Sequence, residues 1–187
     1  MDRHSKVAPV SLTTNAAFSA YYLIFGILSE SWWLLTLGSY YLILSILRFV
    51  VLLTKTNERF TTRFSGIMLI ALSISLVGTV ILSVVHDRGN QFHMIVMIAI
   101  AAYSFAKITL ATVNLVKSQR SYSATLIALR NISFADAFVS IFALQRSMLV
   151  SFEGMTETEI IIMNATLGSA VCIIVLMLGI NLLRNKK

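Results

Sequence analysis

The segment ALRNISFADAF, residues 128–138, decides how this chain is interpreted, because it places charged and amide side chains inside a long apolar run. The run covers residues 122–152 and exceeds the roughly 20 residues that a membrane-spanning helix needs. Asp136 lies near its middle, and Arg130 and Asn131 precede it by one to two helical turns. Each charge at mid-membrane costs about 2.5–3.5 kcal/mol on insertion scales. We therefore expect these side chains to face other helices rather than lipid.

Composition predicts a membrane protein along the whole chain. Of the 187 residues, 57% are hydrophobic and 12% are charged, whereas a soluble domain carries roughly 25% charge. The apolar runs predict an all-α polytopic protein with six spans: 11–28, 32–54, 64–85, 94–116, 122–152 and 160–183. The loops are short, so residues 1–187 are expected to form one transmembrane domain in the lipid bilayer. No cleavable signal peptide is evident, and we expect the first span to be retained.

The charged residues predict the orientation of these spans. Basic residues gather at one set of span ends: Arg3, Lys6, Lys55, Arg59, Arg63, Lys117, Arg120, Arg184, Lys186 and Lys187. The opposite ends carry mostly acids: Glu30, Asp87 with Arg88, Glu153, Glu157 and Glu159. By the positive-inside rule, both termini are cytoplasmic. The net charge of +7 then reflects topology, and no nucleic-acid partner is expected.

An internal repeat connects the even-numbered spans. Three stretches of equal length align without gaps: 39–58, 101–120 and 168–187. Lys55, Lys117 and Arg184 fall within a residue of the same aligned position. NAAFSAYY (15–22) in the first span also resembles NISFADAF (131–138) in the fifth. These matches predict three helical hairpins: 11–54, 64–116 and 122–183.

The stretch LLTLGSYYLILSILRFVVLL, residues 34–53, resembles the repeat of the HdeD-like acid-resistance membrane proteins. Gly38, Arg48 and Lys55 fit the glycine, arginine and basic exit of that repeat, whereas the fourth span has Leu110 in place of the arginine. The resemblance implies a stress-related, multi-pass protein of the bacterial inner membrane, with six spans in three short hairpins. It implies little about chemistry.

Lys107 and Asp136 form the leading candidate site. Lys107 lies near the middle of the fourth span, as Asp136 does in the fifth, so we expect the two helices to pack around a contact between them. One hypothesis is a proton or ion site, where a nearby ammonium sets the protonation of a buried carboxylate. The alternative is a structural ion pair that fixes helix register.

The arginines and asparagines of the spans are assigned mainly to packing. Arg48 is expected to snorkel to the cytoplasmic surface, and Arg146 to reach the outer surface or Glu153. Arg130 lies deeper, and with Asn131 it could hold an anionic headgroup or a substrate carboxylate. The other polar residues are assigned to interhelical hydrogen bonds and packing, among them Asn15, Asn114, Asn164, Asn181, Tyr41 and Tyr103.

Catalysis has little support. The chain has no HExxH or GxSxG motif, and His4, His86 and His93 lie in the tail or one loop. Cys172 is the single cysteine, which excludes an intrachain disulfide and a thiolate metal site. We expect no catalytic residue, no metal and no cofactor.

Several functions remain open from the sequence. The leading interpretation is a small transporter, channel or transport subunit, with a substrate or ion at Lys107, Asp136, Arg130 and Asn131. The alternatives are a non-transporting stress or assembly factor that acts through helix contacts, and the substrate-binding subunit of an energy-coupling-factor importer. Homo-oligomerisation is compatible with all three.

Overall fold

The computed structural model describes residues 4–54, 58–85, 94–118, 123–151 and 154–184. Within these ranges the chain is helical and contains no strand, which confirms the all-α prediction. The helices are α1 (His4–Leu28), α2 (Trp32–Leu53), α3 (Glu58–Val85), α4 (Met94–Ser118), α5 (Ala124–Ser151) and α6 (Glu157–Arg184). Each coincides with one predicted span, but α1 and α3 begin several residues earlier, inside the predicted tail and loop.

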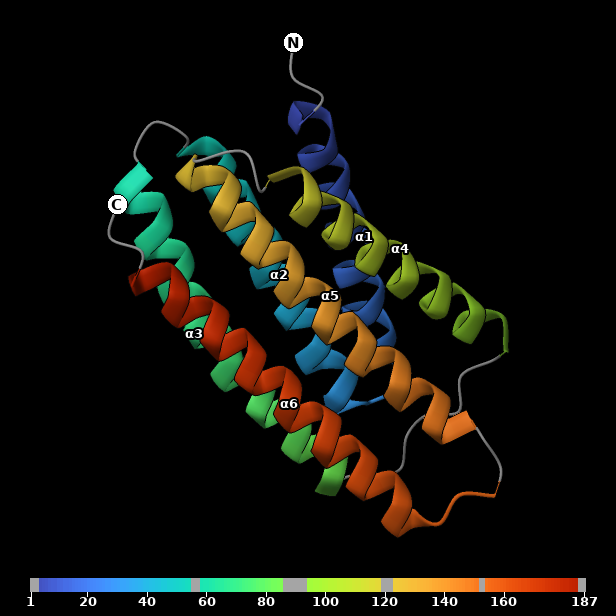
Figure 1. The fold of residues 1–187 in the computed structure, drawn as a ribbon. Helices are drawn as coiled ribbons and strands as arrows, with labels where there is room; N and C mark the ends of the chain where they lie inside the picture. The colour runs from blue at the N-terminus through green and yellow to red at the C-terminus, as the bar shows by residue number, and fades with distance from the viewer. Residues whose placement is uncertain (1–3, 55–57, 86–93, 119–122, 152–153, 185–187) are drawn as a thin grey trace.

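The six helices form an up-and-down bundle (Figure 1). The N-terminal ends of α1, α3 and α5 lie at the same end of the bundle as the C-terminal ends of α2, α4 and α6. Helices α2 and α5 pack against each other at the centre, with α1 against α2, α4 against α5, and the α3–α6 pair along their other side.

The outer surface of the bundle is apolar. Large hydrophobic side chains are exposed on every helix, for example Ile24, Phe49, Ile74, Phe105, Met148 and Ile173. Within the described residues, four helices are long and apolar enough to cross a membrane: Trp32–Leu53, Glu58–Val85, Ala124–Leu149 and Glu157–Arg184. Helix α1 contributes a shorter apolar segment, Asn15–Leu28. The helices are therefore those of a membrane protein, and the count of six spans stays a prediction.

The core lies between α2 and α5. Leu37, Tyr40, Leu44, Leu47 and Val51 follow one another at three- and four-residue steps along α2 and are fully buried. This spacing places them on one face of the helix. The facing residues of α5 are also fully buried: Ile132, Ala135, Val139 and Phe142. Because the facing sides of α2 and α5 are buried, any polar side chain on those sides also lies inside the bundle.

Helices α3 and α6 meet through glycine. A Cβ atom built on Gly66 would lie 3.0 Å from the Gly179 carbonyl oxygen, and one built on Gly179 would lie 3.0 Å from the Gly66 carbonyl oxygen. Side chains would also collide, since the same two Cβ atoms fall 2.8 Å from Leu183 and Ile70 respectively. We call Gly66 and Gly179 the glycine seam. Small residues allow this close backbone approach, which suits helices that associate by packing in lipid.

The packing does not follow three separate hairpins. Helices α1 and α2 pack together, as do α5 and α6, but α3 packs on α6, α2 and α5. Within the described residues, the backbones of α3 and α4 do not come into contact. The three-hairpin repeat is not confirmed by this arrangement and stays a prediction.

The contacts suit a division into two halves of three helices. Exchanging α1 with α4, α2 with α5 and α3 with α6 converts the α1–α2 contact into α4–α5, and α2–α3 into α5–α6. The α2–α5 and α3–α6 contacts map onto themselves, whereas α3–α5 has no counterpart in the described residues. Since each half has an odd number of helices, equivalent helices run in opposite directions, as in inverted-topology repeats.

Candidate functional site

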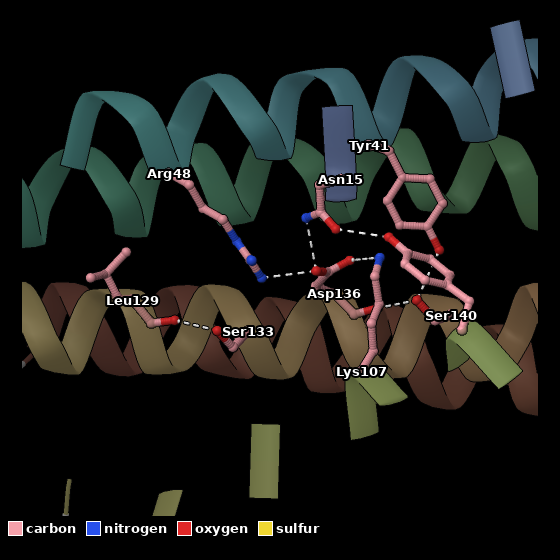
Figure 2. A network of polar contacts seen from close by, with 9 residues as sticks. Asn15, Tyr41, Arg48, Lys107, Leu129, Ser133, Asp136 and Ser140 are labelled. Atoms are coloured by element: carbon pink, nitrogen blue, oxygen red, sulfur yellow. Dashed lines mark hydrogen bonds and ion pairs between the residues drawn. The ribbon is translucent and has the colours of Figure 1, made fainter. Parts of the chain in front are cut away.

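Four helices converge on the carboxylate of Asp136 (Figure 2). Lys107 Nζ on α4 donates to Oδ1 at 2.5 Å, and Arg48 Nη2 on α2 donates to Oδ2 at 2.8 Å. Asn15 Nδ2 on α1 donates to Oδ2, also at 2.8 Å. Asp136 itself is 2% exposed. We call Asn15, Arg48, Lys107 and Asp136 the Asp136 cluster. The predicted Lys107–Asp136 contact and the packing of α4 on α5 are both confirmed.

Aromatic rings enclose the Lys107 ammonium. Nζ lies 4.2 Å from the centre of the Tyr41 ring and 4.3 Å from that of Tyr103. The Tyr103 hydroxyl donates to Asn15 Oδ1 at 2.9 Å, and Phe18 stacks on the Tyr103 ring. Ring faces attract a cation, most strongly where water is excluded. The two tyrosines thus hold Lys107 in place, and Tyr103 also orients the Asn15 amide that donates to Asp136.

Ser140 ties the next turn of α5 to its neighbours. Its hydroxyl donates to the Asp136 carbonyl one turn earlier, and the Tyr41 and Ser140 hydroxyls lie 3.0 Å apart (Figure 2). Ser104 on α4 donates to the Ser140 carbonyl at 3.1 Å. These bonds fix α2 and α4 against α5 beside the charged groups, so small helix shifts would be felt at the Asp136 carboxylate.

Arg48 was misassigned by the sequence. It was expected to snorkel to the membrane surface, but it is 4% exposed and paired with Asp136. The reason is its place on α2. Arg48 follows Tyr41 by seven residues, which puts both on the face toward α5. The Asp136 carboxylate on the facing helix α5 attracts the Arg48 guanidinium more strongly than distant water does, because Coulomb interactions are larger where water is excluded.

Arg146 does not reach the outer surface, which was one of its two expected positions, because its side chain is only 3% exposed. The alternative contact with Glu153, which lies outside the described residues, stays a prediction. Arg146 Nη1 donates to the Ser83 carbonyl at 2.8 Å, and its guanidinium lies 4.7 Å from the centre of the Trp33 ring. Ser83 is in the last turn of α3, where carbonyls lack partners within the helix. Arg146 therefore supports the end of α3 from inside the bundle.

The structure does not bring Arg130 and Asn131 to the Asp136 carboxylate. Its polar partners among the described residues are Asn15, Arg48 and Lys107. Arg130 is six residues before Asp136 and Asn131 is five, which turns them roughly 240° and 140° around the helix from it. Asn131 is buried and Arg130 is partly exposed. Their role as ligands stays a prediction.

Several polar atoms of α2 are buried without a partner in the described parts of the chain. They are Arg48 Nε, Tyr40 Oη, Ser45 Oγ and Trp33 Nε1. A buried donor without an acceptor costs about 1–3 kcal/mol. The Arg48 atom is the most informative, because its neighbouring Nη2 already contacts Asp136.

A separate groove with a volume of about 600 Å³ lies between the C-terminal half of α5 and the N-terminal part of α6. Its lining is largely apolar: Ile141, Leu144, Gln145, Met148, Leu149, Gly154, Met155 and Met163. None of these residues belongs to the Asp136 cluster. An apolar groove on an apolar surface is what lipid chains fill in a membrane.

Neither the side chains of the described residues nor the comparisons with known proteins indicate a particular chemistry. Within the described residues, no group of three histidine, cysteine, aspartate or glutamate side chains could hold a metal ion. Comparisons with protein-family models, with curated proteins and with solved structures found no match. The resemblance to the HdeD-like proteins therefore stays a prediction from the sequence.

Proposed function

We propose that this protein is a small integral membrane transporter, channel or transport subunit, with the Asp136 cluster as its ion- or substrate-binding site. In this proposal all six helices span the membrane. The carrying observation is a buried carboxylate on α5 in the middle of an apolar bundle, held by groups from three other helices.

The proposed orientation has both termini in the cytoplasm. Arg63 near the start of α3 and Arg184 at the end of α6 lie at one end of the bundle. Glu30, Glu157 and Glu159 belong to the other end. Basic residues remain on the cytoplasmic side during insertion, which supports this orientation. The proposed location is the plasma membrane of a bacterial cell.

The energy of burial favours a function over a purely structural role. A buried ion pair can often be replaced by apolar residues without loss of stability, or with a gain. In lipid the charges are costly as well, and ionisable residues inside membranes commonly mark ion or proton pathways. Apolar residues would suffice for stability at these positions, so the three charged groups are best explained by a functional role.

The arrangement suggests how occupancy could change the bundle. A proton on Asp136 would weaken its bonds to Lys107 and Arg48, which come from α4 and α2. Because α1 is held to the same carboxylate through Asn15, the contacts that three helices make with this residue of α5 would change together. Such linkage between charge and helix position is what a gating or alternating-access step requires.

Flux measurements in proteoliposomes test this proposal. Asp136→Asn keeps the size of the side chain and should abolish proton or ion flux while the protein still inserts. Lys107→Met should also reduce flux strongly. Ser133→Ala is a matched control on α5, since the Ser133 hydroxyl donates to the Leu129 carbonyl of its own helix (Figure 2). Equal flux in all four proteins, wild type included, would remove the basis for a transport role.

A non-transporting membrane factor is the second candidate. It is favoured by the completeness of the Asp136 contacts, which join α1, α2 and α4 to α5 as a purely structural network would. This candidate predicts loss of thermal stability in each single variant, partial recovery in the Lys107→Met/Asp136→Asn double variant, and no flux in any protein.

A further inference from the structure

The Asp136 cluster holds more positive than negative charge. Arg48 and Lys107 supply two cations, and Asp136 supplies one carboxylate. Arginine keeps its proton in proteins, so the guanidinium remains charged at any physiological pH. With lysine protonated, the buried site carries a net charge of +1, and the other member of the cluster, Asn15, is neutral.

Donors in the cluster also exceed acceptors. Arg48 presents Nε and Nη2 along one edge of its guanidinium, an edge that suits two oxygens of one anion. Only Nη2 of this pair contacts Asp136, while Nε is buried without a partner in the described residues. Lys107 has three N–H donors, of which one is given to Asp136. Its other contacts described here are the ring faces of Tyr41 and Tyr103.

We propose that the Asp136 cluster binds a small monovalent anion, with Arg48 and Lys107 as its ligands. The anion restores neutrality to the buried site and accepts from the unused donor of Arg48. Asp136 then acts as an internal competitor, since its carboxylate occupies the same two cations. A cation as ligand is disfavoured, because it would raise the net charge from +1 to +2.

This inference deepens the proposed function by naming the class of ligand, and it rests on the same site. A single charge defines that class, which includes chloride and a small carboxylate such as formate. Formate has two oxygens for the guanidinium edge, whereas chloride has the charge alone. Binding of formate but not chloride would assign the site to carboxylates, and equal binding would assign it to charge.

Substitutions that change the charge of the cluster in steps test the inference. Lys107→Met lowers the net charge to 0 and Asp136→Asn raises it to +2, each by one unit from +1. The double variant returns to +1. Protein in nanodiscs is titrated with sodium formate or chloride, against the bulky MES anion at constant ionic strength. Binding is read from the shift of the unfolding temperature and from dialysis with labelled anion.

The expected affinities follow the charge. Asp136→Asn should bind the anion about 10-fold or more tightly than wild type, and Lys107→Met about 10-fold or more weakly. The double variant should lie within about threefold of wild type. Arg63→Gln is the control, because it removes a positive charge from an exposed position on α3 outside the cluster, and its affinity should match wild type.

Two results would overturn the inference. One is weaker anion binding in Asp136→Asn, which would make the carboxylate part of a cation or proton site. The other is anion affinity that does not change across the series, which would place binding elsewhere. Both are separate from the flux test. Flux that depends on Asp136, without this order of anion affinities, would refute the anion inference and support transport. The predicted order of affinities without any flux would support anion binding and refute transport.

Discussion

At the Asp136 cluster, side chains from four helices meet through charge, while at the glycine seam the backbones of α3 and α6 meet with little between them. Both regions hold helices together inside an apolar surface. The seam needs only small residues and complementary shape, so it forms without any polar side chain. The cluster uses costly groups for a similar mechanical result. This difference indicates that stability alone does not explain the cluster.

The largest expected effect comes from removing the carboxylate altogether. Asp136→Ala leaves Arg48 and Lys107 buried without their anion, and breaking a buried pair in this way costs about 3–5 kcal/mol. The free energy of unfolding, measured by denaturant titration of the protein in nanodiscs, should fall by that amount. Adding Lys107→Met should restore part of the loss, since it removes one of the two uncompensated cations. A double variant that shows the sum of both losses would mean that the pair is not coupled.

A smaller effect is expected at the seam. The methyl group of Gly179→Ala would meet Ile70 and the Gly66 carbonyl, and overpacking of this kind costs about 1–3 kcal/mol. Gly78→Ala is the matched control on α3, because nothing lies within 4 Å of a Cβ atom there. It should be neutral or stabilise by up to about 1 kcal/mol, since alanine favours the helix more than glycine. Equal effects of the two changes on the unfolding temperature would contradict the close approach of α3 and α6.

The smallest effect is expected from single hydroxyls at the edge of the cluster. Tyr103→Phe removes the donor to Asn15 but keeps the ring under Lys107, and should cost about 0.5–1.5 kcal/mol. Tyr40→Phe removes a buried hydroxyl that has no partner in the described residues, and should be neutral or stabilising. Thermal unfolding of the two variants side by side checks the opposite signs. A loss in Tyr40→Phe as large as in Tyr103→Phe would show that hydrogen bonding is not what separates them.

The cluster and the seam also differ in how much of each could be predicted from the sequence. Lys107 and Asp136 were paired correctly, because a lone amine and a lone acid at similar depth in neighbouring spans have few other partners. The Arg48 contact was missed because Arg48 is close enough to the end of its helix for its side chain to extend to the membrane surface, which favoured snorkelling. Its seven-residue spacing from Tyr41 was the available signal, since it places both on one helix face.

The seam left no usable signal in the sequence. Gly66 and Gly179 lie far apart along the chain, and single glycines in apolar runs are common in membrane helices. A prediction based on local hairpins pairs helices that are neighbours in sequence. Helix α3 instead packs on α6, and the complementary shape of their surfaces is visible only in the folded structure. The Lys107–Asp136 contact was thus easier to predict than the apolar seam, because few residues could form it.

Ion flux measured together with stability distinguishes a binding site from a purely structural contact at the Asp136 cluster. Asp136→Asn and Gly179→Ala are reconstituted in equal amounts, and ion flux for each folded molecule is measured beside the free energy of unfolding. We expect flux to fall at least about 10-fold in Asp136→Asn and to stay near wild type in Gly179→Ala, although both variants lose stability. If flux instead declines in proportion to stability in both variants, the Asp136 cluster is a structural joint and the proposed site is wrong.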